Sequence, residues 1–281
     1  MSSHNSSLVR PIIIAVTIAL SSFPLFGKTS HTHSVTDSTV QMQFGIDSTR
    51  ADSLLAHTLE SKRFVFRFSS HFLHVDQLRD NAPLYDAFCD SAARLLQLRD
   101  SSFKTVVCLF ANREEWAFCV RGWPPPDREN RAVTFRFEVC SYGLRPIEHE
   151  AVHVLCNRFL AYSKSVFFAE GIEQYVEIAR SNDTFRNAVR IAKKFLNEPF
   201  QRWASDSVGF WATPFDDSDV VAYPVSGLFV RYLIQRSGLD TFKEFYRRIR
   251  TEVSTEAAFS LVYGQSLSEA TSDFKKAIAS W

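Results

Sequence analysis

The spacing of apolar residues changes about halfway along the chain. In the first half, runs of aromatic and β-branched residues predict strands at residues 64–68, 105–110 and 132–139. Helical spacing and capping residues predict helices at residues 49–61, from Asn81 onward and after Asn112. The apolar stripe of the second of these helices consists of Leu84, Phe88, Ala92, Leu95 and Leu96. The first half therefore predicts a mixture of strands and helices.

From Pro146 onward the apolar spacing is helical almost throughout. The expected helices span residues 146–160, 167–181, 184–197, 223–237, 239–250 and 268–279, with Gly238 as a C-terminal cap. Strands mixed with helices, followed by helices alone, predict an α+β fold. We expect a sheet lobe at 60–145 and a mostly helical lobe at 146–281.

The N-terminal segment departs from this globular pattern. Arg10 precedes an apolar run of about 10 residues and then small residues, which is typical of a secretory signal peptide over residues 1–27. The alternative is an uncleaved anchor, because Ile12 to Phe26 approaches the roughly 20 residues that span a bilayer. Polar residues 28–48 predict a flexible linker before a domain at 49–281. We therefore expect an exported protein, periplasmic or secreted, that contacts a membrane only if this segment is retained.

Composition narrows the classes of partner. The chain has 281 residues, 46% of them hydrophobic, which is enough for one large domain or two small ones. Its 32 basic and 31 acidic residues nearly cancel, so the net charge gives no indication of binding to nucleic acid. Five cysteines leave room for one or two disulfides in an oxidising compartment, without naming the pairs.

Candidate chemistry lies on the helix that opens at Pro146. His149 and His153, four positions apart, share one helical face, and Glu150 stands beside them in an H-E-x-x-H motif. The next expected helix offers Glu170. A catalytic zinc ion takes three protein ligands and a water, so His149, His153 and Glu170 meet the required number. Glu150 could then act as the general base on that water.

These motifs resemble those of the gluzincin zinc peptidases. The residues that carry the resemblance are His149-Glu150-Ala151-Val152-His153 and Phe167-Phe168-Ala169-Glu170-Gly171. The sequence is most similar to peptidase MA-like proteins and more distantly to the thermolysin and membrane alanyl aminopeptidase families. The resemblance implies a zincin-like fold with His149, His153 and Glu170 as zinc ligands and Glu150 as base. Phe167 replaces the group's tryptophan, and no G-x-M-E-N segment precedes His149.

The resemblance continues at Ala222–Leu233, which is similar to a tyrosine-led helix of this group, and at Tyr263–Glu269. Tyr223 precedes Pro224 and is therefore expected at the N-terminal edge of a helix. Its phenol could donate to the oxyanion of a tetrahedral intermediate, or it could be an ordinary amphipathic tyrosine. Arg231, further along, is expected to be structural.

Several neighbouring residues keep two interpretations. Glu173 is either an acceptor that holds a zinc histidine by its other ring nitrogen or a solvated helix charge. It is also an alternative third ligand, although Glu170 carries the motif. Cys156 is expected to pack in the core rather than to ligate a metal. Asp216–Asp219 is expected to be a solvated turn, and surface or packing roles are expected for His71 and His74.

The sequence thus predicts an exported zinc metallopeptidase that hydrolyses peptide or protein substrates. The strand near Phe135 to Val139 could supply a sheet edge for an extended peptide. The rival from another class is a non-catalytic binding or scaffold protein that keeps a zinc-peptidase fold. An intramembrane protease is excluded, since the His149 helix is neither long nor apolar enough to span.

Overall fold

The computed structural model describes residues 45–98, 103–121, 131–144, 147–198, 200–205, 218–252 and 254–281. All of these residues belong to the unit Gln41–Trp281. The expected signal segment, most of the expected linker and the Asp216–Asp217 pair lie outside the described residues. No helix in the described ranges has both the length and the apolar character that crossing a membrane requires.

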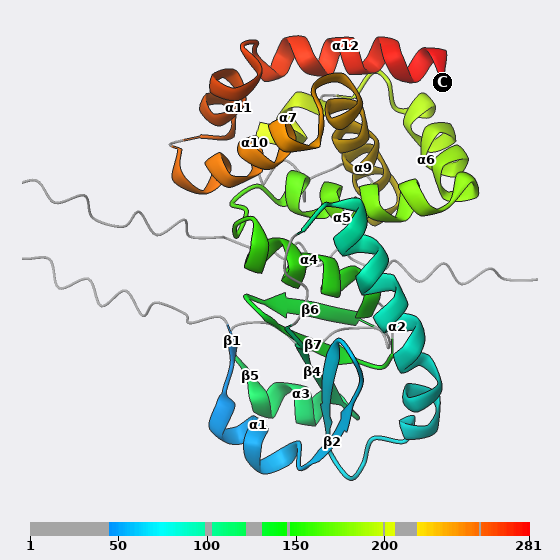
Figure 1. Cartoon of the computed structure of the whole chain (residues 1–281), viewed down its shortest axis with the longest axis vertical. Coiled ribbons are helices and arrows are strands. Elements are labelled where there is room, and N and C mark those ends of the chain that lie inside the picture. Colours follow the sequence, from blue (N-terminus) through cyan, green and yellow to red (C-terminus); the bar gives the residue numbers. More distant parts are fainter. Residues whose placement is uncertain are drawn as a thin grey trace, which may run out of the picture. The chain divides into compact units, whose positions relative to one another are not determined.

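A five-stranded mixed sheet forms the first part of this unit (Figure 1). Its order is β2 (His57–Glu60), β3 (Phe64–Phe68), β4 (Thr105–Phe110), β7 (Glu138–Tyr142) and β6 (Arg131–Phe135). The three central strands are parallel, and the two edge strands pair antiparallel to them. A separate short ladder joins β1 (Gly45–Ile46) to β5 (Val120–Arg121). Strand β6 therefore lies at one edge of this sheet.

Both faces of the sheet are covered by helices. Helix α2 (Val75–Leu95) connects the parallel strands β3 and β4, as a parallel pair requires. Phe64, Phe66 and Val107 pack in the main core that α2 shares with the later helices. The opposite face forms a smaller core with α1 (Ser48–Leu54) and α3 (Arg113–Cys119), where Trp116 is buried. Two separate apolar clusters therefore hold the sheet.

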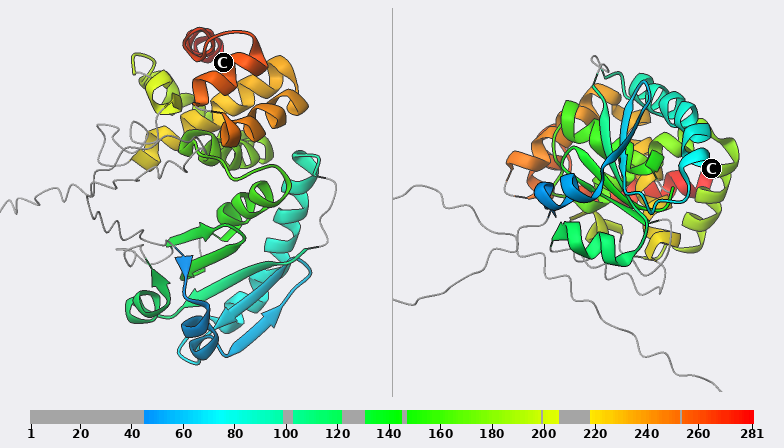
Figure 2. Two further views of the ribbon diagram at one scale, coloured as in Figure 1. Left: turned by 90° about the vertical axis from the view of Figure 1, so that its left-hand side faces the viewer. Right: turned by 90° about the horizontal axis from the view of Figure 1, so that it is seen from below.

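In the described part of the chain, the elements that follow the sheet are all helices (Figures 1 and 2). They are α4 (Ile147–Phe159), α5 (Val166–Arg180), α6 (Asn182–Lys194), α7 (Phe200–Ser205), α9 (Ser218–Ser237), α10 (Leu239–Thr251), α11 (Thr255–Tyr263) and α12 (Leu267–Ser280). Helix α4 contacts β6 and β7 on one side and α5 on the other. The predicted α+β class, a small mixed sheet followed by helices, is confirmed.

Glycines bring α5 and α9 close together. A Cβ placed on Gly171 of α5 would lie 2.9 Å from the main-chain oxygen of Ser226, and one on Gly227 of α9 would lie 2.5 Å from the Cβ of Gln174. Real Cβ atoms do not approach so closely, and only glycine permits this separation of the two helices. The glycine after Glu170 is therefore a packing requirement of the helix pair.

Three predicted elements have different boundaries. The helix expected at 49–61 ends at Leu54, and Leu59 lies on β2. The strand expected at 132–139 is the hairpin of β6 and β7, which turns at Arg136 with a φ of 56°. A two-residue alternation continues through such a hairpin, so the pattern hides the turn. Helix α2 begins at Val75 and contains Pro83, so the helix does not start at Asn81.

Smaller departures concern single residues. Leu84, assigned to the apolar stripe of α2, is 65% exposed, whereas Phe88 and Ala92 are buried. Residues 45–48 are β1 and the start of α1 instead of linker. Helices α7 and α11 were not expected from the spacing. Gly238 follows α9 with a φ of 87° and donates its N–H to the carbonyl of Ile234, which confirms it as a cap.

All five cysteines are buried and free. Cys108 and Cys140 are register partners on adjacent strands, and Cys119 lies in the same small core. Cys89 and Cys156 belong to the main core. The thiols therefore act as small apolar side chains in this structure.

Replacing Gly227 by alanine should destabilise the protein by about 1–3 kcal/mol, because the new methyl group overpacks the α5–α9 contact. Intrinsic helix propensity alone has the opposite sign and favours alanine by about 1 kcal/mol. Urea unfolding of the two proteins measures the difference. Unchanged or increased stability of Gly227→Ala would show that the helices can separate at no cost.

Candidate metal centre

Helix α4 presents two imidazoles toward one point. Ile147, Ala151 and Val154 bury its apolar positions, while His149 and His153 share another face. Their ring centroids are 4.8 Å apart, and the two Nε2 atoms lie 3.1 Å from each other. This is the geometry that a four-residue separation on a helix predicts.

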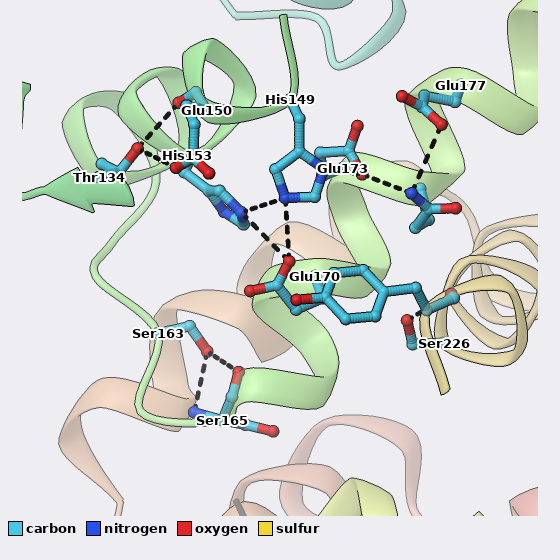
Figure 3. A network of polar contacts seen from close by, with 12 residues as sticks. Thr134, His149, Glu150, His153, Ser163, Ser165, Glu170, Glu173, Glu177 and Ser226 are labelled. Carbon is cyan, nitrogen blue, oxygen red and sulfur yellow. Dashed lines mark hydrogen bonds and ion pairs between the residues drawn. The ribbon is translucent and has the colours of Figure 1, made fainter. Parts of the chain in front are cut away.

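A carboxylate from α5 completes the cluster (Figure 3). The Oε2 atom of Glu170 lies 3.1 Å from Nε2 of His149 and 3.4 Å from Nε2 of His153. One ligand atom from each residue falls within 4.8 Å of the other two, and no other such group occurs within the described ranges. Two nitrogen donors and one oxygen donor at this separation fit a zinc-like ion with an open fourth position.

The charges around this cluster attract a cation. Burial by itself lowers the pKa of His149, but the carboxylates of Glu173 and Glu170 outweigh burial and raise that pKa well above its usual value. Burial also lowers the pKa of His153, but the carboxylate of Glu170, followed by that of Glu150, outweighs burial and raises that pKa. Burial raises the pKa of Glu170, and the neighbouring histidines overcome this and lower it. A metal ion would compete with protons for these donors.

Glu173 fixes the orientation of one histidine. Its Oε2 lies 2.8 Å from Nδ1 of His149, the ring nitrogen that faces away from the cluster, and its side chain is fully buried. Gln174 donates a further hydrogen bond to the same oxygen at 2.9 Å. A carboxylate on Nδ1 leaves Nε2 as the nitrogen for a metal. Glu173 is therefore a partner of His149, and its interpretation as a solvated helix charge is wrong.

Glu150 lies at the sheet side of α4, next to the edge strand. Its Oε2 accepts a hydrogen bond of 2.6 Å from the hydroxyl of Thr134 on β6, and the residue is 7% exposed (Figure 3). The negative charge of Glu150 also acts on His153. The structure thus brings Glu150 together with the three candidate ligands, as the sequence predicts.

Tyr223 reaches the same place from α9. Its ring centroid lies 6.0 Å from that of His149. The expectation of a helix edge is wrong, because α9 begins at Ser218 and contains both Tyr223 and Pro224. Arg231 places its guanidinium over the ring of Phe185 at 4.6 Å, which is a packing contact.

The remaining candidates lie apart from the cluster or pack beneath it. Cys156 is buried, and this burial together with the charge of Glu173 raises the pKa of its thiol, so core packing is confirmed. Phe167 is buried against the ring of Phe229. His71 pairs through Nδ1 with Glu115 at 3.0 Å, and the ring of His74 contacts that of Phe72. Neither histidine belongs to the group formed by His149, His153 and Glu170.

Sequence reasoning missed Thr134. The period-two pattern of β6 assigns it to one face of the sheet, but no local pattern indicates that this face meets Glu150. The missing information is the packing of α4 on an edge strand from the other part of the fold.

No protein-family model matches the chain, and the comparison with curated proteins finds no match.

Glu177 should make stability depend on pH. Burial, followed by the charge of Glu173, raises its pKa to about 7. A carboxyl whose pKa is higher in the folded state binds more protons there, so stability is lost as pH rises from about 4.5 to about 7. In metal-free protein, Glu177→Gln should make this pH-dependent loss of stability smaller by on the order of 1–2 kcal/mol. The figure allows for solvent screening, because Glu177 is partly exposed. Urea unfolding at pH 4.5 and pH 7.5 measures it.

The matched control is Glu114→Gln, on an exposed position of α3. This variant should keep the pH profile of the wild type. An equal pH dependence in Glu177→Gln and the wild type would assign the effect to other groups.

Proposed function

We propose that this protein is a zinc metallopeptidase of the gluzincin type with a zincin-like fold, similar to peptidase MA-like proteins. The observation that carries the proposal is the convergence of His149 Nε2, His153 Nε2 and Glu170 Oε2 within 4.8 Å of one another. Glu150, a carboxylate with no place in that ligand set, is held beside it. Three ligands together with a separate base are what metal-assisted hydrolysis requires.

The chemistry divides among the side chains. A bound zinc ion would polarise the substrate carbonyl and lower the pKa of a water. His149, His153 and Glu170 would hold it, and Glu173 would keep His149 in the ligating tautomer. Glu150 takes the proton from the attacking water and delivers it to the leaving amine. Tyr223 donates a hydrogen bond from its phenol to the oxyanion that develops on the carbonyl.

The proposed substrate is an extended peptide or protein segment. Strand β6 is the last strand of the sheet, and its Thr134 contacts the proposed base. An edge strand offers main-chain donors and acceptors for a peptide that adds as a further strand. A peptide aligned on β6 would bring a scissile bond beside Glu150. The edge expected near Phe135 to Val139 is wrong after Phe135, because residues 136 and 137 form the turn and residues 138 and 139 belong to β7, which lies between β4 and β6. The edge strand is Arg131–Phe135.

We also propose that the protein is exported, on the basis of the charged, apolar and small-residue order of its first 27 residues. The segment is either cleaved or retained as an anchor. Peptide hydrolysis outside the cytoplasm would then be the activity of this chain.

Glu150→Gln should retain zinc and lose hydrolysis by about three orders of magnitude or more, since an amide cannot accept the proton. The assay is digestion of a peptide library by the zinc-loaded protein, with mass spectrometry of the products. A chelator should abolish cleavage by the wild type, and added zinc should restore it. Full activity of Glu150→Gln would contradict the assigned mechanism.

The same experiment tests the rival scaffold class. A protein that binds stoichiometric zinc but cleaves no peptide would be a binding protein with a retained metal site. Absence of stoichiometric zinc would contradict the proposed metal centre itself.

Tyr223→Phe should lower kcat by about 10- to 100-fold with little change in KM, because the phenol is proposed to act on charge that appears only in the transition state. Steady-state kinetics on one cleaved peptide measure this split. Tyr232→Phe, on the same helix, serves as the control. Wild-type kcat in Tyr223→Phe would make Tyr223 an ordinary packing residue.

A further inference from the structure

Thr134 is the polar exception on its side of β6. Side chains along a strand alternate between the two faces of the sheet. Val133 and Phe135 pack in the small core, and Ala132 packs against the main core that includes α4. Thr134 shares the face of Ala132. Its β-branched shape suits a strand, but that preference does not account for where its hydroxyl goes.

The hydroxyl goes to Glu150 (Figure 3). Thr134 Oγ1 lies 2.6 Å from Oε2 of Glu150 and 3.2 Å from the main-chain oxygen of the same residue. A hydroxyl has one proton to donate, and short contacts are typical of donation to a carboxylate. Within the described part of the chain, the side-chain hydrogen bond of Glu150 runs through Oε2, and Oε1 stays available.

We propose that Thr134 is a positioning residue for the reaction: by holding Oε2 of Glu150 it fixes the carboxylate so that Oε1 accepts the proton of the attacking water. This inference rests on the proposed peptidase function. The terminal torsion of a glutamate is broad and needs an external contact to be fixed. A catalytic group displaced by about 1 Å can lose on the order of 100-fold in rate. One hydrogen bond can therefore control turnover.

A merely structural role would give different results. The same contact links the edge strand to α4, so its loss could loosen that interface. In that case stability and zinc binding would suffer, and any substitution that disturbs packing would have the same effect. If Thr134 positions Glu150, kcat should fall only in variants that lack the hydroxyl, and zinc binding should be retained.

Two substitutions separate these roles. Thr134→Val keeps the shape and removes the hydroxyl, and Thr134→Ser keeps the hydroxyl. In zinc-loaded protein, Thr134→Val should lower kcat by about 10- to 100-fold, with KM within about twofold of the wild type. Zinc stoichiometry should stay near the wild type, whereas Tm should fall by a few degrees because a buried acceptor loses its donor. Thr134→Ser should recover kcat to within about threefold.

Thr58 provides the matched control. It lies exposed on β2, the opposite edge strand of the same sheet. Thr58→Val makes the same chemical change far from Glu150 along the sheet and should leave kcat and KM unchanged. Wild-type kcat in Thr134→Val would overturn the proposal. Equal loss of kcat in the valine and serine variants would also overturn it.

Binding of a peptide hydroxamate separates this inference from the peptidase proposal. A hydroxamate chelates zinc and offers protons to a neighbouring carboxylate, so its affinity reports on Glu150 without turnover. If the wild type cleaves no peptide, the peptidase proposal fails, and calorimetry with the hydroxamate decides the role of Thr134. About tenfold weaker binding by Thr134→Val, with recovery in Thr134→Ser, supports positioning. Equal affinity for all three proteins, or no binding to the wild type, contradicts it.

Discussion

The candidate site depends on how the chain compensates a buried carboxylate. Glu173 is fully buried, and an uncompensated charge at such a position would cost several kcal/mol. His149 and Gln174 compensate its Oε2 atom, at 2.8 and 2.9 Å, whereas Oε1 is buried without a hydrogen-bond partner among the described residues. Because Glu173 belongs to α5 and His149 to α4, the same contact sets the two helices relative to each other. It also turns Nε2 of His149 toward Glu170.

The layers of the fold then bring the other groups to that point. Helix α4 packs between the sheet and α5, so its histidines meet α5 while Glu150 meets β6. Gly171 allows α9 to pack close to α5, which brings Tyr223 near His149. Five functional candidates therefore come from three helices, and the edge strand supports one of them. No single element carries the proposed chemistry.

The success of each prediction depended on how far the residue lies along the chain from the partners that define its role. His149, Glu150 and His153 share one helix, where geometry is local and the pattern is sufficient. Glu170 lies on the next helix and was assigned with the help of a family resemblance. Glu173 kept two interpretations, because a helix position alone does not tell whether solvent or another helix faces it. Tyr223 was expected at the right site but at the wrong place in its helix.

The sequence by itself determined the α+β order, most helices after residue 146 and the two histidines with the glutamate between them. It did so because helical and strand periodicities are local properties of the chain. Only the tertiary structure decided that residues 132–139 form a hairpin, that Glu173 is buried on His149 and that Thr134 contacts Glu150. Each of these depends on which surfaces meet across long separations in sequence. The spacing of side chains along the chain does not predict these long-range contacts. They depend on how surfaces pack and on which groups compensate a buried charge.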